Sequence, residues 1–251
     1  MRIVSLSPSS TEILFALGAG DEVIGVTQYC DYPSNALRRQ QLGSWLHVQP
    51  SLIEALKPDL IVTTTHIPSE LRMYDGHGQL LHLEPTTLAG VLESVLMVGR
   101  AVGRTQAAED VVQAMQRDLE DIRRLAPRQK LLVYCEAFST PPMHAGYWIP
   151  ECIEIAGGTP VGGFHANPST PASVDALRVA DPDLMVFHWC GRDEVFDAEH
   201  IRNRPGWSEL RAVQTNALAF LPENLLNRPG PRLVDGVRQL QAVLTHHQQL
   251  Q

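Results

Sequence analysis

The sequence has no long apolar run, no basic run and no closely spaced cysteines, and each absence excludes a class of protein. No apolar stretch approaches the roughly 20 residues that a membrane-spanning helix needs. A formal net charge of −8 argues against binding to the phosphates of a nucleic acid. The four cysteines form no CxxC pair, which indicates reduced thiols rather than a disulfide framework or a zinc site.

The motifs of several common enzyme classes are also missing. The chain contains no GxxxxGKS/T loop, no GxSxG elbow and no HExxH pair. Gly18-Ala19-Gly20 resembles the start of a dinucleotide-binding fingerprint, but it follows a predicted helix, whereas a pyrophosphate-binding turn must precede one. We therefore expect no enzymatic activity, no catalytic cofactor and no catalytic residue.

The first residues, MRIVSLSP, bear on the compartment. Ile3-Val4, which is strand-like, follows the methionine without the charged segment and apolar stretch of a secretory signal. The sequence as it stands therefore predicts a cytoplasmic protein, whereas removal of a leader before this start would make a periplasmic protein the expectation.

The most regular stretch of the sequence is the segment 105–126. Its apolar residues recur at spacings of three and four over about six turns, which predicts one amphipathic helix roughly 33 Å long. Thr105 is placed to cap the helix, and Pro127 is placed to end it. The helix is either an ordinary crossover inside one domain or a rigid strut between two lobes.

Strand and helix signals alternate on both sides of this segment, a pattern typical of mainly parallel sheets covered by helices. Two stretches also repeat each other, because 54–62 and 178–186 both read as a helix end, a Pro-Asp-Leu turn and a buried strand. We therefore predict an α/β protein of two lobes. Its expected parts are an N-terminal lobe at 1–104, a bridging helix at 105–126 and a C-terminal lobe at 127–251.

Ligands of open parallel sheets bind at the carboxyl ends of the strands, so the loops that leave those ends are the candidate sites. Aromatic side chains are frequent there, and exposed rings favour a flat, partly apolar ligand, although each ring could instead fold back onto the core. The candidate ligand-binding residues are Ser7, Pro8, Tyr29, Trp45, His66, Phe138, Trp148 and Trp189, with Asn224 and Arg228 in the loop 223–228.

His66, His144 and His188 fall in or near these loops, so an imidazole there could reach a metal such as a corrinoid cobalt. However, a chain with ten histidines places several in loops in any case, and no pair has i,i+4 spacing beside a carboxylate. We predict no metal site and keep His66 and His144 as candidate axial ligands.

Several motifs, in order, look like the substrate-binding proteins of ABC importers for cobalamin, haem and ferric siderophores. These are RIVSLSPSSTE at 2–12, Tyr29 with Asp31-Tyr32-Pro33, Gly43-Ser44-Trp45 and ALKPDLIV at 55–62. Three further segments, 146–151, 156–158 and 227–236, are similar to the cobalamin-binding branch in particular. The likeness spans nearly the whole chain.

The resemblance implies the class III periplasmic binding protein plan, in which one long rigid helix bridges two α/β lobes and the ligand lies between them. Tyr29 and Trp45 match family positions that contact the corrinoid. Asn224 and Arg228 lie in a segment that matches a loop at the ligand's nucleotide side. The implied ligand is cobalamin or a related corrinoid.

The same resemblance implies docking on an ABC permease through surface carboxylates. Asp175 matches one of these, whereas Ser51 replaces the other, for which Glu54 one helical turn away can substitute. Ala156 and Gln241 stand at the positions of the family's disulfide, so that crosslink cannot form. We expect a monomer that delivers its ligand to a permease.

Three alternatives stay open. Ser169 lies near the position of a ligand-stacking tryptophan, so haem or a ferric siderophore could replace cobalamin as ligand. A cytosolic corrinoid carrier or sensor would act without an importer. A tetrapyrrole chelatase would share the plan but need a histidine and a carboxylate acting together, for which Glu136 with His144 or His66 is the candidate set.

Overall fold

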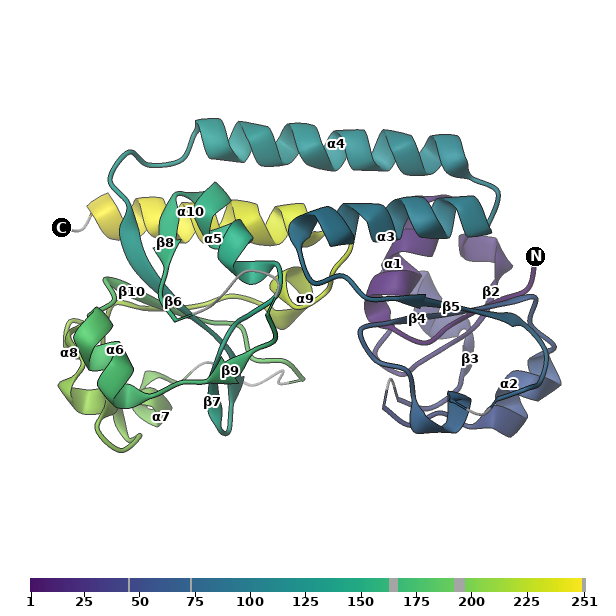
Figure 1. Cartoon of the computed structure of the whole chain (residues 1–251), viewed down its shortest axis with the longest axis horizontal. Helices are drawn as coiled ribbons and strands as arrows, with labels where there is room; N and C mark the ends of the chain where they lie inside the picture. Colours follow the sequence, from purple (N-terminus) through teal and green to yellow (C-terminus); the bar gives the residue numbers. More distant parts are fainter. Residues whose placement is uncertain (45, 73, 163–166, 192–196, 250–251) are drawn as a thin grey trace. The chain divides into compact units, whose positions relative to one another are not determined.

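The computed structural model describes residues 1–44, 46–72, 74–162, 167–191 and 197–249, which form two compact units (Figure 1). Unit 1 comprises Met1–Pro85, Ala89–Met115 and Pro229–Pro231, and unit 2 comprises Thr86–Leu88, Gln116–Arg228 and Arg232–Gln251. The boundary between the units thus falls within the long helix rather than at its ends, and the short segment Pro229–Pro231 belongs to unit 1.

Unit 1 is built on a parallel sheet with the strand order β3-β2-β1-β4-β5. The order reverses at β1, since β2 and β3 lie on one side of it and β4 and β5 on the other. β1 and β4 are buried throughout, as expected for central strands covered on both faces. The strands are β1 (Ile3–Ser5), β2 (Val23–Val26), β3 (Gln40–Gln41), β4 (Leu60–Thr64) and β5 (Gln79–Leu83).

The helices of unit 1 flank this sheet. α1 (Pro8–Ala16) packs against β1 and β4, and α2 (Pro50–Leu56) packs against β2. A side chain at Gly99 in α3 (Leu88–Ala101) would clash with Ala108 of the long helix α4 (Thr105–Arg124), so the two helices are in close contact there. The described residues of this unit also form three short 3₁₀ turns: η1 (Gly20–Glu22), η2 (Ser34–Arg38) and η3 (Ser69–Leu71).

Unit 2 contains a mixed sheet with the order β11-β10-β6-β7-β9, and β8 also pairs with β6. β8 and β10 run parallel to β6, whereas β7 is antiparallel to it. The segment 138–148, expected to be a loop, includes the end of β6 and all of β7, because adjacent prolines hide the strand signal. The strands are β6 (Leu131–Ser139), β7 (Pro142–His144), β8 (Gly158–Pro160), β9 (Thr170–Pro171), β10 (Leu184–Phe187) and β11 (Leu218–Phe220).

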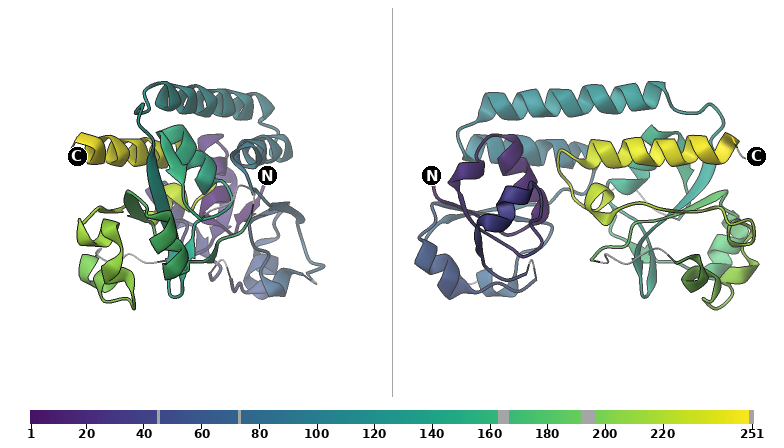
Figure 2. Two further views of the ribbon diagram at one scale, coloured as in Figure 1. Left: turned by 60° about the vertical axis from the view of Figure 1, so that its left-hand side comes forward. Right: turned by 180° about the vertical axis from the view of Figure 1, so that it is seen from behind.

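Helices also flank the sheet of unit 2. α5 (Ile149–Ala156) packs against α10 (Leu233–Gln249), as the front and back views show (Figures 1 and 2). A separate core cluster joins aromatic side chains of β6 and β10 to those near the turn η4 (Trp207–Glu209). The remaining helices are α6 (Val174–Ala180), α7 (Ala198–Arg202), α8 (Arg211–Gln214) and α9 (Glu223–Leu226), the last within a segment expected to be a loop.

The two Pro-Asp-Leu turns, one in each unit, have the same backbone geometry. Lys57 and Asp181, each the residue before the proline, both adopt a left-handed conformation with φ of 45°. The carboxylate of Asp59 accepts a hydrogen bond from the Arg2 backbone N–H at 2.7 Å, and that of Asp183 accepts one from Leu132 at 2.8 Å. The repeat seen in the sequence is therefore also a repeat of structure.

The long helix α4 (Thr105–Arg124) is continuous and amphipathic. Its predicted apolar face is buried at Ala108, Met115 and Ile122. The helix ends two residues before the predicted end, and Leu125, expected on the buried face, is 72% exposed. Its role as a rigid strut stays a prediction. Among the described residues, no helix combines the length and apolar character that crossing a membrane requires.

Candidate functional site

The carboxyl end of β1 enters α1 through a network of buried hydroxyl groups. The Ser7 hydroxyl caps the helix by accepting a hydrogen bond from the Ser10 N–H at 3.3 Å. The Ser5 hydroxyl lies 2.8 Å from the hydroxyls of both Ser10 and Thr11. The Ser7 side chain is therefore engaged mainly in capping. Pro8 is half-buried and is the more exposed of these two predicted site residues.

The neighbouring strand β4 ends in a strained turn. Thr65 has a φ of 61°, and the His66 N–H donates to the Thr64 carbonyl oxygen at 2.7 Å. These features define the rarer form of the γ-turn, whose strain is on the order of 1–3 kcal/mol. Such strain is concentrated at ligand sites, and this turn lies where the strand order of the sheet reverses. The structure therefore places the half-buried His66 at the expected edge of the sheet.

Tyr29 projects from a turn at the carboxyl end of β2. The Cys30 N–H donates to the Thr27 carbonyl oxygen at 3.1 Å, which fixes the turn, and the tyrosine is 45% exposed. The Gln28 N–H donates to the Gly43 carbonyl oxygen at 3.0 Å, so the turn lies next to the loop that leads to Trp45. Trp45 itself lies outside the described residues. Tyr29 thus supplies an exposed aromatic ring at the predicted site.

Glu54, predicted to dock on a permease, is engaged within unit 1. Its carboxylate accepts hydrogen bonds from the Tyr74 hydroxyl at 2.8 Å and the His77 backbone N–H at 3.0 Å, and from the His77 ring. The His77 backbone bond, followed by those from Tyr74 and the His77 ring, lowers the pKa of Glu54 from 4.5 to about 2. Glu54 therefore holds the 74–77 turn onto α2, and its docking role stays a prediction.

This arrangement predicts a pH-dependent contribution of Glu54 to stability. Because its pKa is lower in the folded than in the unfolded protein, the stabilisation is fully present above pH 4.5 and is lost as the pH falls toward 2. The melting temperature of wild type should therefore exceed that of Glu54→Gln at pH 6, and the gap should narrow below pH 4. The control is Glu93→Gln, which removes an exposed carboxylate on α3. An equal difference in melting temperature between wild type and Glu54→Gln at every pH would contradict the prediction.

In unit 2, the fully buried carboxylate of Glu136 is saturated with hydrogen bonds. One oxygen accepts from the Tyr134 hydroxyl at 2.7 Å and from Arg204 at 2.8 Å, and the other accepts from the Trp189 indole at 2.7 Å and from Arg204 at 2.8 Å. The Arg204 guanidinium also lies 4.5 Å from the centre of the Trp207 ring. Two bonds on each oxygen leave no acceptor position for a substrate proton.

The histidine nearest to this carboxylate is enclosed as well. His144 is 7% exposed, its ring packs against Gly162, and its centroid lies 5.1 Å from that of Tyr134. Burial lowers the pKa of His144, partly opposed by a hydrogen bond with the Val161 backbone. Glu136 and His144 are thus built as core groups, which argues against the acid–base pair that a chelatase would need.

The remaining aromatic residues that were predicted to bind a ligand differ in their exposure to solvent. Trp148 is 5% exposed and its indole N–H donates to the Leu226 carbonyl oxygen at 2.9 Å, and Trp189 is 2% exposed and bonded to Glu136. Both indoles have folded back onto the core and offer a ligand little surface. Phe138, near the carboxyl end of β6, is 40% exposed and is the accessible ring of this set in unit 2.

The segment 223–228 follows β11 and carries the two predicted polar contacts. Asn224 is half-buried, and Arg228 is 8% exposed, with its guanidinium donating to Glu223 at 3.0 Å. Asn227, between them, bonds twice to His188 at the carboxyl end of β10. The segment therefore lies at the expected edge of the sheet and is held there by side-chain contacts.

Asp175, the other predicted docking residue, lies in the first turn of α6. Its side chain is 84% exposed and accepts a hydrogen bond from Arg178 at 2.6 Å. An exposed ion pair of this kind contributes little to stability, so the carboxylate can exchange Arg178 for a cationic group on another protein. The accessible position agrees with a docking role, which stays a prediction.

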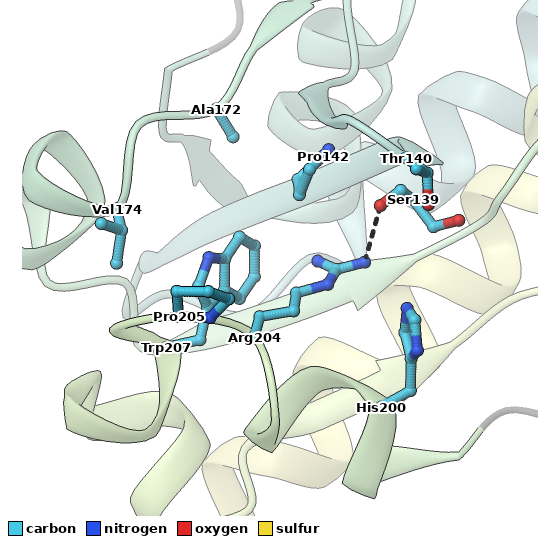
Figure 3. A pocket seen from close by; sticks show the side chains of 9 residues that line it. All are labelled: Ser139, Thr140, Pro142, Ala172, Val174, His200, Arg204, Pro205 and Trp207. Carbon is cyan, nitrogen blue, oxygen red and sulfur yellow. Dashed lines mark hydrogen bonds between the residues drawn. The ribbon is translucent and has the colours of Figure 1, made fainter.

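A pocket of about 340 Å³ opens beside the carboxyl end of β6 (Figure 3). Trp207, Pro205, Pro142 and Val174 provide most of its apolar walls, and Arg204 reaches across it to donate to the Ser139 carbonyl oxygen at 3.3 Å. Its other lining residues are Thr140, Ala172 and His200. A pocket of this size and lining suits an apolar group more than a charged one.

Within the described part of the chain there is neither a metal cluster nor a disulfide. Among the described residues, no three His, Cys, Asp or Glu side chains are grouped as metal ligands. The four cysteines, all of which are described, form no disulfide. Axial ligation of a bound metal by His66 or His144 stays a prediction.

Sequence reasoning missed Arg204 and the contact between Asn227 and His188. Arg204 lies 68 residues from Glu136 and Asn227 lies 39 residues from His188, so no local spacing links either pair. The signal available in the sequence was the carboxylate of Glu136 within the apolar stretch 131–138, because a buried carboxylate requires donors from elsewhere in the chain.

Comparison with known proteins supports one family. The family model described as periplasmic binding protein matches residues 3–225. The ABC transporter substrate-binding lipoprotein YvrC of Bacillus subtilis is 29% identical over 95% of this chain and 78% of its own length. The vitamin B12-binding protein of Vibrio cholerae is 28% identical over 95% of this chain and 87% of its own.

The solved structure of the periplasmic haem-binding protein RhuT from Roseiflexus sp. RS-1 has the same fold. It aligns with a TM-score of 0.84 at 23% sequence identity and covers 98% of both chains. This likeness confirms the predicted class III α/β fold, with mainly parallel sheets flanked by helices. The family match and the relatives' names also confirm the resemblance to importer-linked binding proteins, and with it binding rather than catalysis.

Proposed function

The chain belongs to the periplasmic binding protein family, and we propose that it captures a corrinoid such as cobalamin and delivers it to an ABC permease. The observation that carries the proposal is the similarity to a vitamin B12-binding protein over 95% of this chain. A haem-binding protein with the same fold shares 23% identity, a level that does not favour one ligand over the other.

The exposed rings at the carboxyl ends of the strands support a planar ligand. Tyr29 in unit 1 and Phe138 in unit 2 are each at least 40% exposed, although large aromatic side chains are usually buried. A flat macrocycle gains most from contact with such rings, while a few polar groups fix its orientation. We propose that Asn224 and Arg228 supply polar contacts, that Trp45 adds a ring, and that Ser7, Pro8 and His66 line the edge of unit 1.

Delivery would depend on carboxylates that meet a basic surface. We propose Asp175 as the principal docking residue because its carboxylate is exposed. Glu54 could add to docking only by weakening its hydrogen bonds to the 74–77 turn. Attraction between such charges weakens as salt rises, so complex formation should be salt-sensitive. The family's compartment leads us to propose that this chain acts in the periplasm as a monomer.

Isothermal titration of the purified protein tests the proposal. Cobalamin, cobinamide, haem and ferrichrome are titrated separately, and cobalamin is expected to bind most tightly. A dissociation constant weaker than about 100 µM for all four, equivalent to roughly −5.5 kcal/mol, would overturn the binding function. Tight binding of haem or ferrichrome alone would keep the capture function and replace the ligand. Unchanged uptake in a deletion strain would instead favour a carrier or sensor without an importer.

A further inference from the structure

Two side chains tie the carboxyl end of β10 to the segment 223–228. The Asn227 side-chain amide donates to the backbone carbonyl oxygen of His188 at 2.6 Å, and its oxygen lies 2.7 Å from His188 Nδ1. His188 is fully buried, and its backbone N–H donates to the Glu136 carbonyl oxygen at 3.0 Å. The sheet therefore holds His188, and His188 in turn holds Asn227.

The chemistry of the contact fixes the tautomer of the histidine. A carbonyl oxygen can only accept, so the Asn227 atom that faces it must be the amide nitrogen. The Asn227 oxygen then faces Nδ1 of His188, which must carry the hydrogen. Burial lowers the pKa of His188 to about 4, so the ring is neutral at pH 7. The two side chains thus keep one hydrogen-bond pattern at that pH.

Contacts from Trp148, Arg232 and α10 also hold the segment 223–228. The Trp148 indole donates to the Leu226 carbonyl oxygen at 2.9 Å, and Arg232 donates to the Asn224 carbonyl oxygen at 3.4 Å. A Cβ added at Gly236 would lie 2.8 Å from the Leu225 carbonyl oxygen, so α10 packs directly on the backbone of α9. The segment is therefore fixed between the helices and the end of β10.

We propose that His188 and Asn227 are positioning residues, which hold the segment 223–228 so that Asn224 and Arg228 meet the nucleotide side of a bound corrinoid. Arg228 directly follows Asn227, and its guanidinium is further fixed by Glu223 at 3.0 Å. A segment that is already ordered before binding loses less conformational freedom when the ligand arrives. The inference rests on the proposed function, because it names how that site is shaped.

The test compares His188→Leu with His188→Gln and uses two corrinoids. Leucine removes the Nδ1 donor, whereas glutamine can still donate to Asn227. His188→Leu should weaken cobalamin binding by about tenfold, the loss expected when a buried hydrogen bond is broken. His188→Gln should recover most of the affinity. Binding of cobinamide, which lacks the nucleotide, should change by less than about twofold, because its contacts lie elsewhere.

Further variants separate positioning from general destabilisation. Asn227→Ala breaks the same two contacts at the partner residue, which is half-buried rather than fully buried. This variant replaces His188→Leu in the test if His188→Leu fails to fold. Hydrogen exchange in both variants should rise within 223–228. Asn203→Ala, which removes an exposed asparagine elsewhere in unit 2, should bind cobalamin normally.

Equal losses for cobalamin and cobinamide, or no loss for either, would overturn the positioning role while the proposed function survives. Failure of the wild-type protein to bind either corrinoid would overturn the proposed ligand and the positioning role together.

Discussion

Replacing Glu136 by leucine should lower the free energy of unfolding by about 3–5 kcal/mol, because it leaves the buried Arg204 guanidinium without its counter-charge. The carboxylate is fully buried and accepts bonds from Tyr134, Trp189 and Arg204, so the substitution also leaves two neutral donors without their acceptor. Urea denaturation followed by circular dichroism measures the change, and the slope of the transition reports whether the folded state keeps its compactness.

A double variant distinguishes the loss of charge pairing from the loss of volume. Glu136→Leu combined with Arg204→Met removes both charges, so it should be less destabilised than the sum of the two single variants. Glu209→Gln, which alters an exposed pair with Arg178, should change stability by less than about 0.5 kcal/mol. A loss below about 1 kcal/mol in Glu136→Leu would contradict the role assigned to this buried carboxylate.

Replacing Tyr29 by alanine should weaken cobalamin binding by about 2–3 kcal/mol, which is roughly 30- to 150-fold. The ring is 45% exposed, so its removal should change the melting temperature little while it removes the proposed aromatic contact with the ligand. Titration calorimetry gives the affinity, and a thermal melt of the same sample gives the stability.

Two further variants show whether the loss of affinity is specific to the Tyr29 ring. Tyr29→Phe keeps the ring and should bind within a few-fold of wild type, about 1 kcal/mol at most. Leu37→Ala, which removes another exposed apolar side chain of unit 1, should leave the affinity unchanged. An equal loss in Leu37→Ala and Tyr29→Ala would indicate a general effect on unit 1 and would remove Tyr29 from the proposed contacts.

The elements that the sequence predicts best are those whose pattern is local. The buried strands β4 and β10 follow the Pro-Asp-Leu turns of the repeats 54–62 and 178–186 as expected, because the apolar runs and the Pro signals lie within a few positions. Residues 142–144, which form β7, were misread as part of a loop because Pro141 and Pro142 interrupt the strand pattern. α9 was missed because four residues are too few to show helical periodicity.

The side chains of the candidate site were harder to place for a different reason. Tyr29 and Trp189 both follow predicted strands, yet one is 45% exposed and the other 2% exposed. Trp189 is drawn inward by Glu136, which lies 53 residues earlier in the chain. Whether a loop ring meets a ligand or the core is thus decided by distant partners, which a single sequence does not reveal.

The matching turns at Asp59 and Asp183 hold one edge of each sheet by hydrogen bonds, whereas the loops at the opposite edge are free to vary in sequence. Both carboxylates bond at the amino ends of strands β1 and β6, whereas the candidate ligand loops leave the opposite ends. Loops at the carboxyl ends can therefore be lengthened, shortened or exchanged without disturbing the bonds that align the strands. One scaffold could in this way be adapted during evolution to ligands of different size, through loop replacement alone.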